Sequence, residues 1–206
     1  MKQADNKIYL ASKSPRRREL LRQIGVEFEV LLLRDNGLNG PDVSEDVLPG
    51  EQPENYVERV TREKADLAAK LIGWRRLPVR PLLAADTTVA VDKQILCKPS
   101  NAQEAATMLR LLSGRTHQVM TSVALRHDDV LKQVTQISQV RFATLTEEMI
   151  ADYCATSEPY DKAGGYGIQG PAAVFVEQIT GSHSGIMGLP LHEVATLLRD
   201  VGIRIP

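Results

Sequence analysis

The sequence predicts an α/β protein built around one sheet. Short apolar segments typical of strands alternate with amphipathic segments typical of helices, from residue 8 to residue 201. The 206 residues are enough for one sizeable α/β domain or for two small lobes around a sheet. No linker-like run, low-complexity tract or internal repeat divides the chain. We therefore expect a single domain over residues 1–206.

The first strand and helix meet at a basic stretch. Apolar residues at 8–10 indicate the strand, and Ser14 is placed to cap a helix that has Pro15 at its first position. Three arginines follow at 16–18. Because a helix start presents free backbone N–H groups and the positive end of its dipole, arginines there make an anion site, most simply for phosphate. The alternative is a capped, solvated helix end with a basic face.

The next part of the chain holds an acidic cluster. The elements expected here are a strand at 26–33, an irregular segment at 34–50, a helix at 53–71 and a basic connector at 74–81. Within the irregular segment stand Asp42, Glu45 and Asp46. These acids form either a metal site or a solvated acidic loop.

An aspartate follows an apolar strand in the middle of the chain. Residues 82–85 predict a buried strand, and Asp86 comes directly after it. A carboxylate there is costly unless it is paired or bound to metal, and α/β sheets place ligands at such strand ends. Further on, a short strand at 95–97 precedes Lys98. These two positions favour a functional interpretation over a structural one.

The second half predicts two paired strands and a glycine-rich segment. The expected elements are a helix at 101–112, antiparallel strands at 117–125 and 134–142 across a turn at 127–129, a helix at 147–156, a strand at 175–179, a loop at 181–188 and a helix at 189–201. The glycines of the segment at 157–170 let the backbone pass close to a ligand or adopt positive φ, and Asp161, Lys162 and Gln169 supply polar contacts.

Composition excludes several classes of function. The net charge of −1 gives no overall attraction to nucleic acid or anionic membrane, and 4% aromatic residues argue against a stacking platform for single strands. Cys97 and Cys154 are too few for a disulfide framework. The N-terminus lacks the apolar run of a signal peptide, and no stretch approaches a membrane span. We expect a cytoplasmic protein that binds neither membrane nor nucleic acid.

Taken together, the separate stretches resemble the Maf family of nucleotide pyrophosphatases. The matching pieces are LASKSPRRRELL at 10–21, DVSE at 42–45, YVERVTREKA at 56–65, AADTTVAVDKQILCKP at 84–99, AATMLRLLSGRTHQVMT at 105–121, SEPYDKAGGYGIQG at 157–170 and GLPL at 188–191. The resemblance covers nearly the whole chain. It implies an inosine-triphosphatase-like α/β fold, with a long mixed central sheet shared by two lobes and a cleft between them.

The resemblance also implies an activity. Members of the family cleave a nucleoside triphosphate between the α and β phosphates, using a divalent cation such as Mg²⁺ or Mn²⁺. It further suggests a homodimer. Because the family name comes from a septum-formation phenotype, a non-enzymatic nucleotide-binding regulator of cell division is the alternative. A third interpretation, RNA binding by the arginine cluster, is disfavoured by the charge and by the few aromatics.

Each matching residue then has an expected role. Cations are needed where charge develops on the leaving pyrophosphate, so the phosphate contacts are assigned to a set spread along the chain: Ser14, Arg16, Arg17, Lys64 and Lys98. Glu45 and Asp86 are the expected metal ligands. Asp86 also matches the proton acceptor that the family assigns for the attacking water. Its two roles are coupled, since a carboxylate cannot bind metal and accept a proton independently.

Three positions indicate the substrate. One branch of the family resembles enzymes acting on dTTP and UTP, and carries the residue types found here at Arg16, Thr87 and Gln169. The other branch resembles enzymes acting on 7-methyl-GTP and carries Trp, Gln and Glu there. A glutamine amide offers a donor and an acceptor, which match O4 and N3–H of a pyrimidine. One departure from the family pattern is the long segment at 31–40, which precedes the acidic motif.

Overall fold

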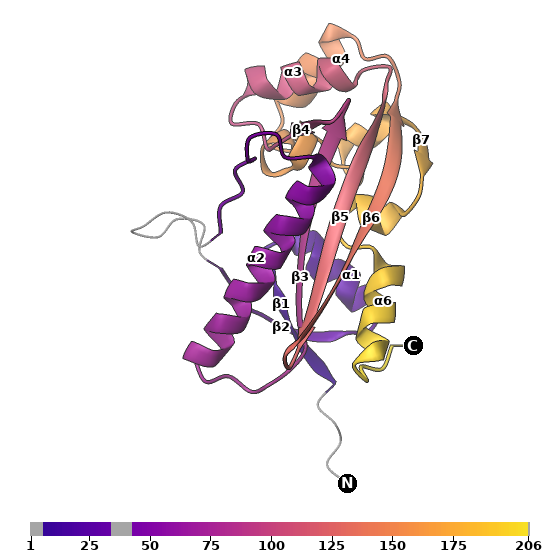
Figure 1. Cartoon of the computed structure of the whole chain (residues 1–206). Coiled ribbons are helices and arrows are strands. Elements are labelled where there is room, and N and C mark those ends of the chain that lie inside the picture. Colours follow the sequence, from indigo (N-terminus) through magenta and orange to yellow (C-terminus); the bar gives the residue numbers. More distant parts are fainter. Residues whose placement is uncertain (1–5, 34–42, 206) are drawn as a thin grey trace.

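The fold is described by a computed structural model for residues 6–33 and 43–205. Over these residues, seven strands form one mixed sheet in the order β2-β1-β3-β5-β6-β7, with β4 paired to β3 (Figure 1). The strands are β1 (Lys7–Ala11), β2 (Glu27–Val30), β3 (Leu82–Val91), β4 (Gln94–Leu96), β5 (Thr116–His127), β6 (Val130–Phe142) and β7 (Val176–Thr180). β1 is parallel to β2 and β3, and the other pairings are antiparallel. The predicted α/β class and mixed sheet are confirmed.

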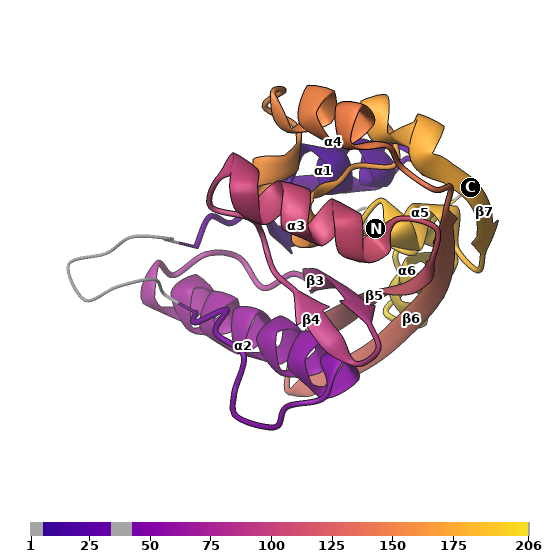
Figure 2. The ribbon, with the colours of Figure 1, turned by 90° about the horizontal axis from the view of Figure 1, so that it is seen from above.

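Helices cover both faces of the sheet. They are α1 (Pro15–Gln23), α2 (Pro53–Trp74), α3 (Ala102–Leu112), α4 (Glu147–Cys154), α5 (His183–Ile186) and α6 (Leu191–Asp200). Figure 2 shows α2 on one side of β3, β5 and β6, and α1, α5 and α6 on the other. Short 3₁₀ turns at Pro159–Asp161, Ala163–Gly165 and Pro171–Phe175 connect α4 to β7. Within the described residues, no helix combines the length and apolar character needed to cross a bilayer.

The last four residues of β1 and the first four of β3 are mainly apolar because both of their faces are buried. Successive side chains of a strand point to opposite faces. One face of β1 and β3 therefore packs in a cluster with α1 and α6, through Ile8, Leu10, Leu83 and Ala85. The other face packs in a cluster with α2, through Tyr9, Ala11, Leu82 and Ala84. By the same alternation, Asp86 falls on the α2 face and Thr87 on the α1 face.

An interruption in the sheet creates room for a site. One edge of β3 pairs with β5 from Leu82 to Ala90. The opposite edge pairs with β1 as far as Ala84 and with β4 only from Val89 onward. Within the described chain, residues 85–88 thus have a strand neighbour on the β5 side alone. A cavity lies against this interruption.

Several predicted elements have different ends in the structure. β2 ends at Val30, short of the predicted 33, and α2 continues one turn beyond 71 to Trp74. The predicted loop at 181–188 contains the short helix α5. Residues 43–50 are irregular, as predicted; Asp42 and most of the long 31–40 segment lie outside the described residues.

The main correction concerns the strand that carries Asp86. A strand was expected at 82–85 with Asp86 after its end, but β3 continues to Val91 with Asp86 inside it. The reason is non-local, since pairing with β5 continues past the polar residues to Ala90. Asp86 nonetheless lies just beyond the carboxyl end of β1, whose last paired residue is Ala11. The expectation that Asp86 ends its own strand is therefore wrong.

Candidate active site

One cavity of about 930 Å³ brings the predicted site residues together. Its walls come from the start of α1, from α2, from the β1–β4 interruption beside β3, and from the segments near 167 and 187. The nine predicted residues that line it are Ser14, Arg16, Arg17, Glu45, Lys64, Asp86, Thr87, Lys98 and Gln169. They belong to six separate stretches of sequence, so the fold alone gathers them.

The start of α1 forms one wall of the cavity. Ser14 caps the helix, and its Oγ accepts the backbone N–H of Arg17 at 3.4 Å. Because the hydroxyl acts as acceptor in this bond, its own proton is left to donate to a ligand. Arg16 lies beside it with 30% of its side chain exposed, and its nearest acid is Asp161 at 3.8 Å. This wall combines a helix N-terminus with an arginine, as an anion site requires.

A lysine joins the two predicted metal ligands. Lys64, on α2, donates to Glu45 Oε1 and to Asp86 Oδ1, at 2.7 Å in both cases. Lys98 donates to the other Glu45 oxygen at 3.1 Å. Although Glu45 belongs to an irregular segment, it is held in place because Tyr56 O–H donates to its carbonyl oxygen at 2.9 Å. The four charged groups thus form one alternating network.

Electrostatics keep Glu45 and Lys64 ionised. Burial by itself would raise the pKa of Glu45, but the Lys64 and Lys98 ammonium groups lower it to about 2. Burial would likewise lower the pKa of Lys64, but Asp86 and Glu45 outweigh it and raise that pKa. Glu45 is therefore a carboxylate at neutral pH, available as an oxygen ligand.

The donor set fits a magnesium-type cation. Glu45 Oε1 and Asp86 Oδ1 both lie 2.7 Å from the same nitrogen, so the two oxygens cannot be farther apart than twice that distance. Mg²⁺ and Mn²⁺ take hard oxygen ligands, and Mg²⁺ commonly uses one or two carboxylates together with phosphate oxygens. No three His, Cys, Asp or Glu side chains of the described chain are grouped to hold a metal by themselves. The residues therefore fit a cation shared with a phosphate ligand.

Arg17 has a different environment from the one predicted. Its guanidinium donates to protein atoms on several elements: Gly188 O at 2.7 Å, Ala85 O at 2.8 Å, Thr87 Oγ1 at 3.1 Å and Ser12 Oγ at 3.3 Å. The carbonyl of Ala85 points toward the β1 edge of β3, as does the Pro81 carbonyl, which accepts the Tyr9 N–H. β1 has already ended at the level of Ala85, so it offers that carbonyl no partner. Arg17 thus satisfies a strand edge that would be unpaired. One of its five N–H groups is left for a ligand.

The glycine-rich segment passes close to other walls of the cavity. A Cβ on Gly164 would lie 2.9 Å from the Val89 side chain, and the residue has φ of +73°. A Cβ on Gly170 would lie 1.9 Å from Glu158 Oε1. Only glycine fits at 164, whereas a larger residue at 170 would require the Glu158 side chain to move. Between them, Gln169 is exposed and lines the cavity, and its amide has no hydrogen-bond partner within the described chain.

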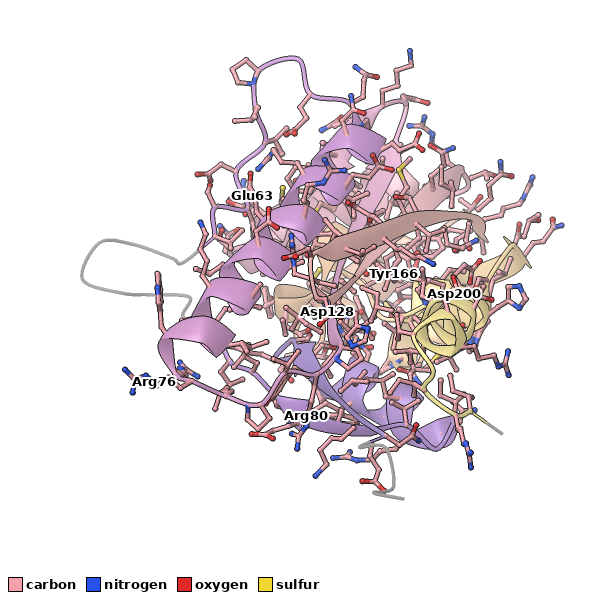
Figure 3. All side chains as sticks on the ribbon, turned by 60° about the horizontal axis from the view of Figure 1, so that its bottom comes forward. Glu63, Arg76, Arg80, Asp128, Tyr166 and Asp200 are labelled. Carbon is pink, nitrogen blue, oxygen red and sulfur yellow. The ribbon has the colours of Figure 1, made fainter. Side chains whose placement is uncertain are left out.

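Sequence reasoning missed an apolar wall. It consists of Val89, Val119, Tyr166, Ile168, Ile186 and Met187. Tyr166 is buried, its hydroxyl lies 2.7 Å from His117 Nε2, and it lies toward the centre of the view in Figure 3. The signal was present in the alternation along two strands, since Thr87 and Val89 share a face of β3. The cavity thus offers charged and apolar surface side by side, which suits a ligand with an anionic tail and a ring.

Comparisons with known proteins give the following similarities. The model of a family described as Maf-like protein matches residues 7–201. A dTTP/UTP pyrophosphatase of Aromatoleum aromaticum is 53% identical over 98% of both chains. Proteins of the same name are 50% identical in Chromobacterium violaceum, over 98% of both chains, and 52% identical in Ralstonia nicotianae, over 96% of this chain and 95% of that one. The structure of the Staphylococcus aureus Ham1 protein has a TM-score of 0.41 and 15% identity, over 66% of this chain and 72% of that one.

Proposed function

The chain belongs to the Maf family, and from this premise we propose that it is a pyrophosphatase acting on dTTP and UTP. The observation that carries the proposal is the convergence of the nine family-matching residues on one cavity. The relatives that bear this name cover nearly the whole chain, so the proposal extends over all of the site's segments. The reaction releases pyrophosphate and leaves the nucleoside monophosphate.

Charge balance supports a divalent cation in this reaction. In the described chain, the cavity is lined by six cationic residues, Lys13, Arg16, Arg17, Lys64, Lys98 and Lys162, and by five acidic ones, Glu45, Asp46, Asp86, Glu158 and Asp161. A triphosphate would add about four negative charges to this nearly balanced set. We propose that Glu45 and Asp86 hold Mg²⁺ or Mn²⁺. When bound, the cation supplies charge neutralisation and polarisation of phosphate oxygens.

The protein's own groups then have distinct roles in the proposed reaction. Arg16, Lys98 and the Ser14 hydroxyl bind the phosphate oxygens, and Lys64 orients Asp86 through the 2.7 Å bond. Asp86 accepts the proton of the attacking water at Oδ2, which has no hydrogen-bond partner within the described chain. The bond between the α-phosphorus and the oxygen bridging to the β-phosphate breaks, and pyrophosphate leaves with that oxygen.

Base selection is proposed for the side of the cavity near Gln169. A free glutamine amide can donate to O4 of uracil or thymine and accept from N3–H. Arg16 contributes from the start of α1, and Thr87 of β3 is the third position proposed for selection. A cytoplasmic homodimer belongs to the same proposal and rests on the family resemblance. The alternative of a non-enzymatic regulator predicts nucleotide binding without turnover.

Pyrophosphate release from a panel of nucleotides tests the proposal. The panel contains dTTP, UTP, CTP, GTP and 7-methyl-GTP, each with Mg²⁺, with Mn²⁺ and with EDTA. We expect turnover of dTTP and UTP above the other nucleotides, and loss of turnover in EDTA. Binding of dTTP without release of pyrophosphate would support the regulator instead. Equal turnover of dTTP and 7-methyl-GTP would contradict the proposed selectivity.

A further inference from the structure

A series of three hydrogen bonds, the first two partly buried and the last fully buried, runs from Arg17 through β3 and β5 to Gly185. Arg17 Nη2 donates to Thr87 Oγ1 at 3.1 Å, Thr87 Oγ1 lies 2.9 Å from Thr121 Oγ1, and Thr121 Oγ1 donates to Gly185 O at 2.8 Å. Thr121 is on β5, directly opposite Thr87 in the strand register, and is fully buried. This series of hydrogen bonds therefore connects α1, β3, β5 and α5.

The direction of each bond follows from the chemistry of its ends. A carbonyl oxygen only accepts, so the single Thr121 proton is committed to Gly185. The Thr87 proton must then be donated to Thr121, because Thr121 has no other to give. The guanidinium of Arg17 only donates, so Thr87 accepts from it. In this arrangement Thr87 has no proton left to donate to a nucleotide base.

The same bonds hold one wall of the cavity at two points. Arg17 Nε donates to Gly188 O at 2.7 Å, while the threonine pair reaches Gly185 O. The turn between these carbonyls carries Ile186 and Met187, which line the cavity. Ile186 also packs in one cluster with Val89 and Val119 of the apolar wall. Fixing the two carbonyls therefore fixes the distance between this turn and the strands.

The turn is also in contact with β6. A Cβ on Gly185 would lie 2.4 Å from Gln136 Oε1, so the turn is seated directly on β6. Ser182 N–H donates to Ser138 Oγ at 2.9 Å, which anchors the residue before α5 to the same strand. The Thr121 bond is the connection from this turn to β5, the strand between β3 and β6.

We propose that Thr121 is a positioning residue for base selection, and that Thr87 acts through it rather than by donating to the base. The hydrogen bond between the two hydroxyls keeps the cavity wall formed by residues 185–188 at the distance from β3 and β5 that a pyrimidine base needs. Without this bond the wall moves, so the pyrimidine bases bind less tightly and the larger purine bases can enter. This inference rests on the proposed pyrophosphatase function.

Thr121→Val and Thr121→Ser form a matched pair for the test. Valine keeps the shape and removes the hydroxyl, whereas serine keeps the hydroxyl. We expect Thr121→Val to raise KM for dTTP and UTP about tenfold, with kcat within about twofold, and to lower the kcat/KM ratio of dTTP over GTP about tenfold. Thr121→Ser retains the parent's ratio. Thr107→Val, at an exposed position on α3, controls for the substitution type.

A double variant tests the shared pathway. If Thr87 acts through Thr121, Thr87→Val with Thr121→Val is no worse than the more impaired single variant. The inference would be overturned if the effects of the two single substitutions on kcat/KM multiply in the double variant. It would also be overturned if Thr121→Val keeps the parent's KM values and its kcat/KM ratio of dTTP over GTP. Should Thr121→Val not fold, Thr121→Cys, a much weaker donor, is judged by the same criteria. A parent chain that releases no pyrophosphate from dTTP would overturn the proposed function itself.

Discussion

The ammonium nitrogen of Lys64 lies 2.7 Å from Asp86 Oδ1, and little of either side chain is exposed. The same nitrogen binds Glu45 at an equal distance, so one positive charge holds two carboxylates together. The interaction joins α2 to β3 beside the interruption in the sheet. Lys64 therefore holds together the two carboxylates that we propose as cation ligands.

Removing this lysine should destabilise the protein in a way that a divalent cation reverses. We expect Lys64→Met to lower the free energy of unfolding by about 2 kcal/mol in EDTA, because two close carboxylates lose their common partner. Millimolar Mg²⁺ should restore more stability to the variant than to the parent. Urea unfolding with and without Mg²⁺ measures both effects.

Lys132→Met is the matched control. Lys132 donates to Asp200 at 2.7 Å on the surface, where both side chains are 46% exposed. Its loss should change stability by less than about 1 kcal/mol, with no response to Mg²⁺. A Lys64→Met protein as stable as its parent in EDTA would show that the lysine does not hold the two acids.

Of the two adjacent arginines, Arg17 should contribute to the stability of the protein and Arg16 to substrate binding. Arg17→Ala should lower the free energy of unfolding by about 3 kcal/mol, because it leaves the Ala85 and Gly188 carbonyls without their donor. Arg16→Ala should leave stability nearly unchanged and raise KM for dTTP by about tenfold or more. Urea unfolding and pyrophosphate-release kinetics on both variants measure this. The reverse pattern would contradict the assignment.

Gln169→Glu tests the proposed hydrogen bonds between the Gln169 amide and the pyrimidine base. A glutamate keeps the size of the side chain and loses the N–H donor that would bind O4. We expect kcat/KM for dTTP and UTP to fall about tenfold or more, with CTP and GTP changed less. Gln103→Glu, at an exposed position on α3, is the control for the added charge. Unchanged discrimination among the four nucleotides would exclude a contact between this amide and the base.

His117 should make the protein sensitive to acid. Burial lowers the pKa of His117 to about 4 from an ordinary value of 6.5, so the imidazole is neutral in the folded protein at pH 7. The unfolded chain takes up the proton first as pH falls, so this contribution is fully present above pH 6.5 and is lost between about 6.5 and 4. The loss amounts to roughly 3 kcal/mol.

Urea unfolding across this pH range measures the effect. His117→Gln should flatten the dependence of stability on pH between 6.5 and 4, whereas His192→Gln, at an exposed position on α6, should retain it. Equal slopes in the parent and in His117→Gln would mean that the buried imidazole is not the titrating group.

Local sequence patterns predicted the local parts of the fold. Ser14 and Pro15 mark the start of α1, and the turn at 127–129 joins β5 to β6. In both cases the signal lies within a few residues of the structure it predicts. The extension of β3 through Asp86 had no such signal, because it depends on pairing with β5, more than thirty residues away.

The site shows the same limit. Arg16 and Arg17 are the same residue type and are adjacent in the sequence. Only the end of β1, which leaves the Ala85 carbonyl without a strand partner, determines that Arg17 and not Arg16 bonds to the protein there. Thr121 lies in a strand of alternating pattern, and nothing in the neighbouring sequence indicates a function for it. The role proposed for it depends on its hydrogen bonds to Thr87 and Gly185, which only the structure shows. Sequence reasoning identified most of the charged residues that line the cavity, Lys13 and Glu158 excepted, but not the contacts that set its shape.

The most direct test of the account is pyrophosphate release by Asp86→Asn. Asparagine keeps the shape and can still accept from Lys64, but it cannot take a proton from water. With dTTP and Mg²⁺, we predict a kcat at least about 100-fold below the parent, while Asp129→Asn in the exposed β5–β6 turn keeps the parent's rate. An Asp86→Asn protein that hydrolyses dTTP as fast as the parent would contradict the central claim.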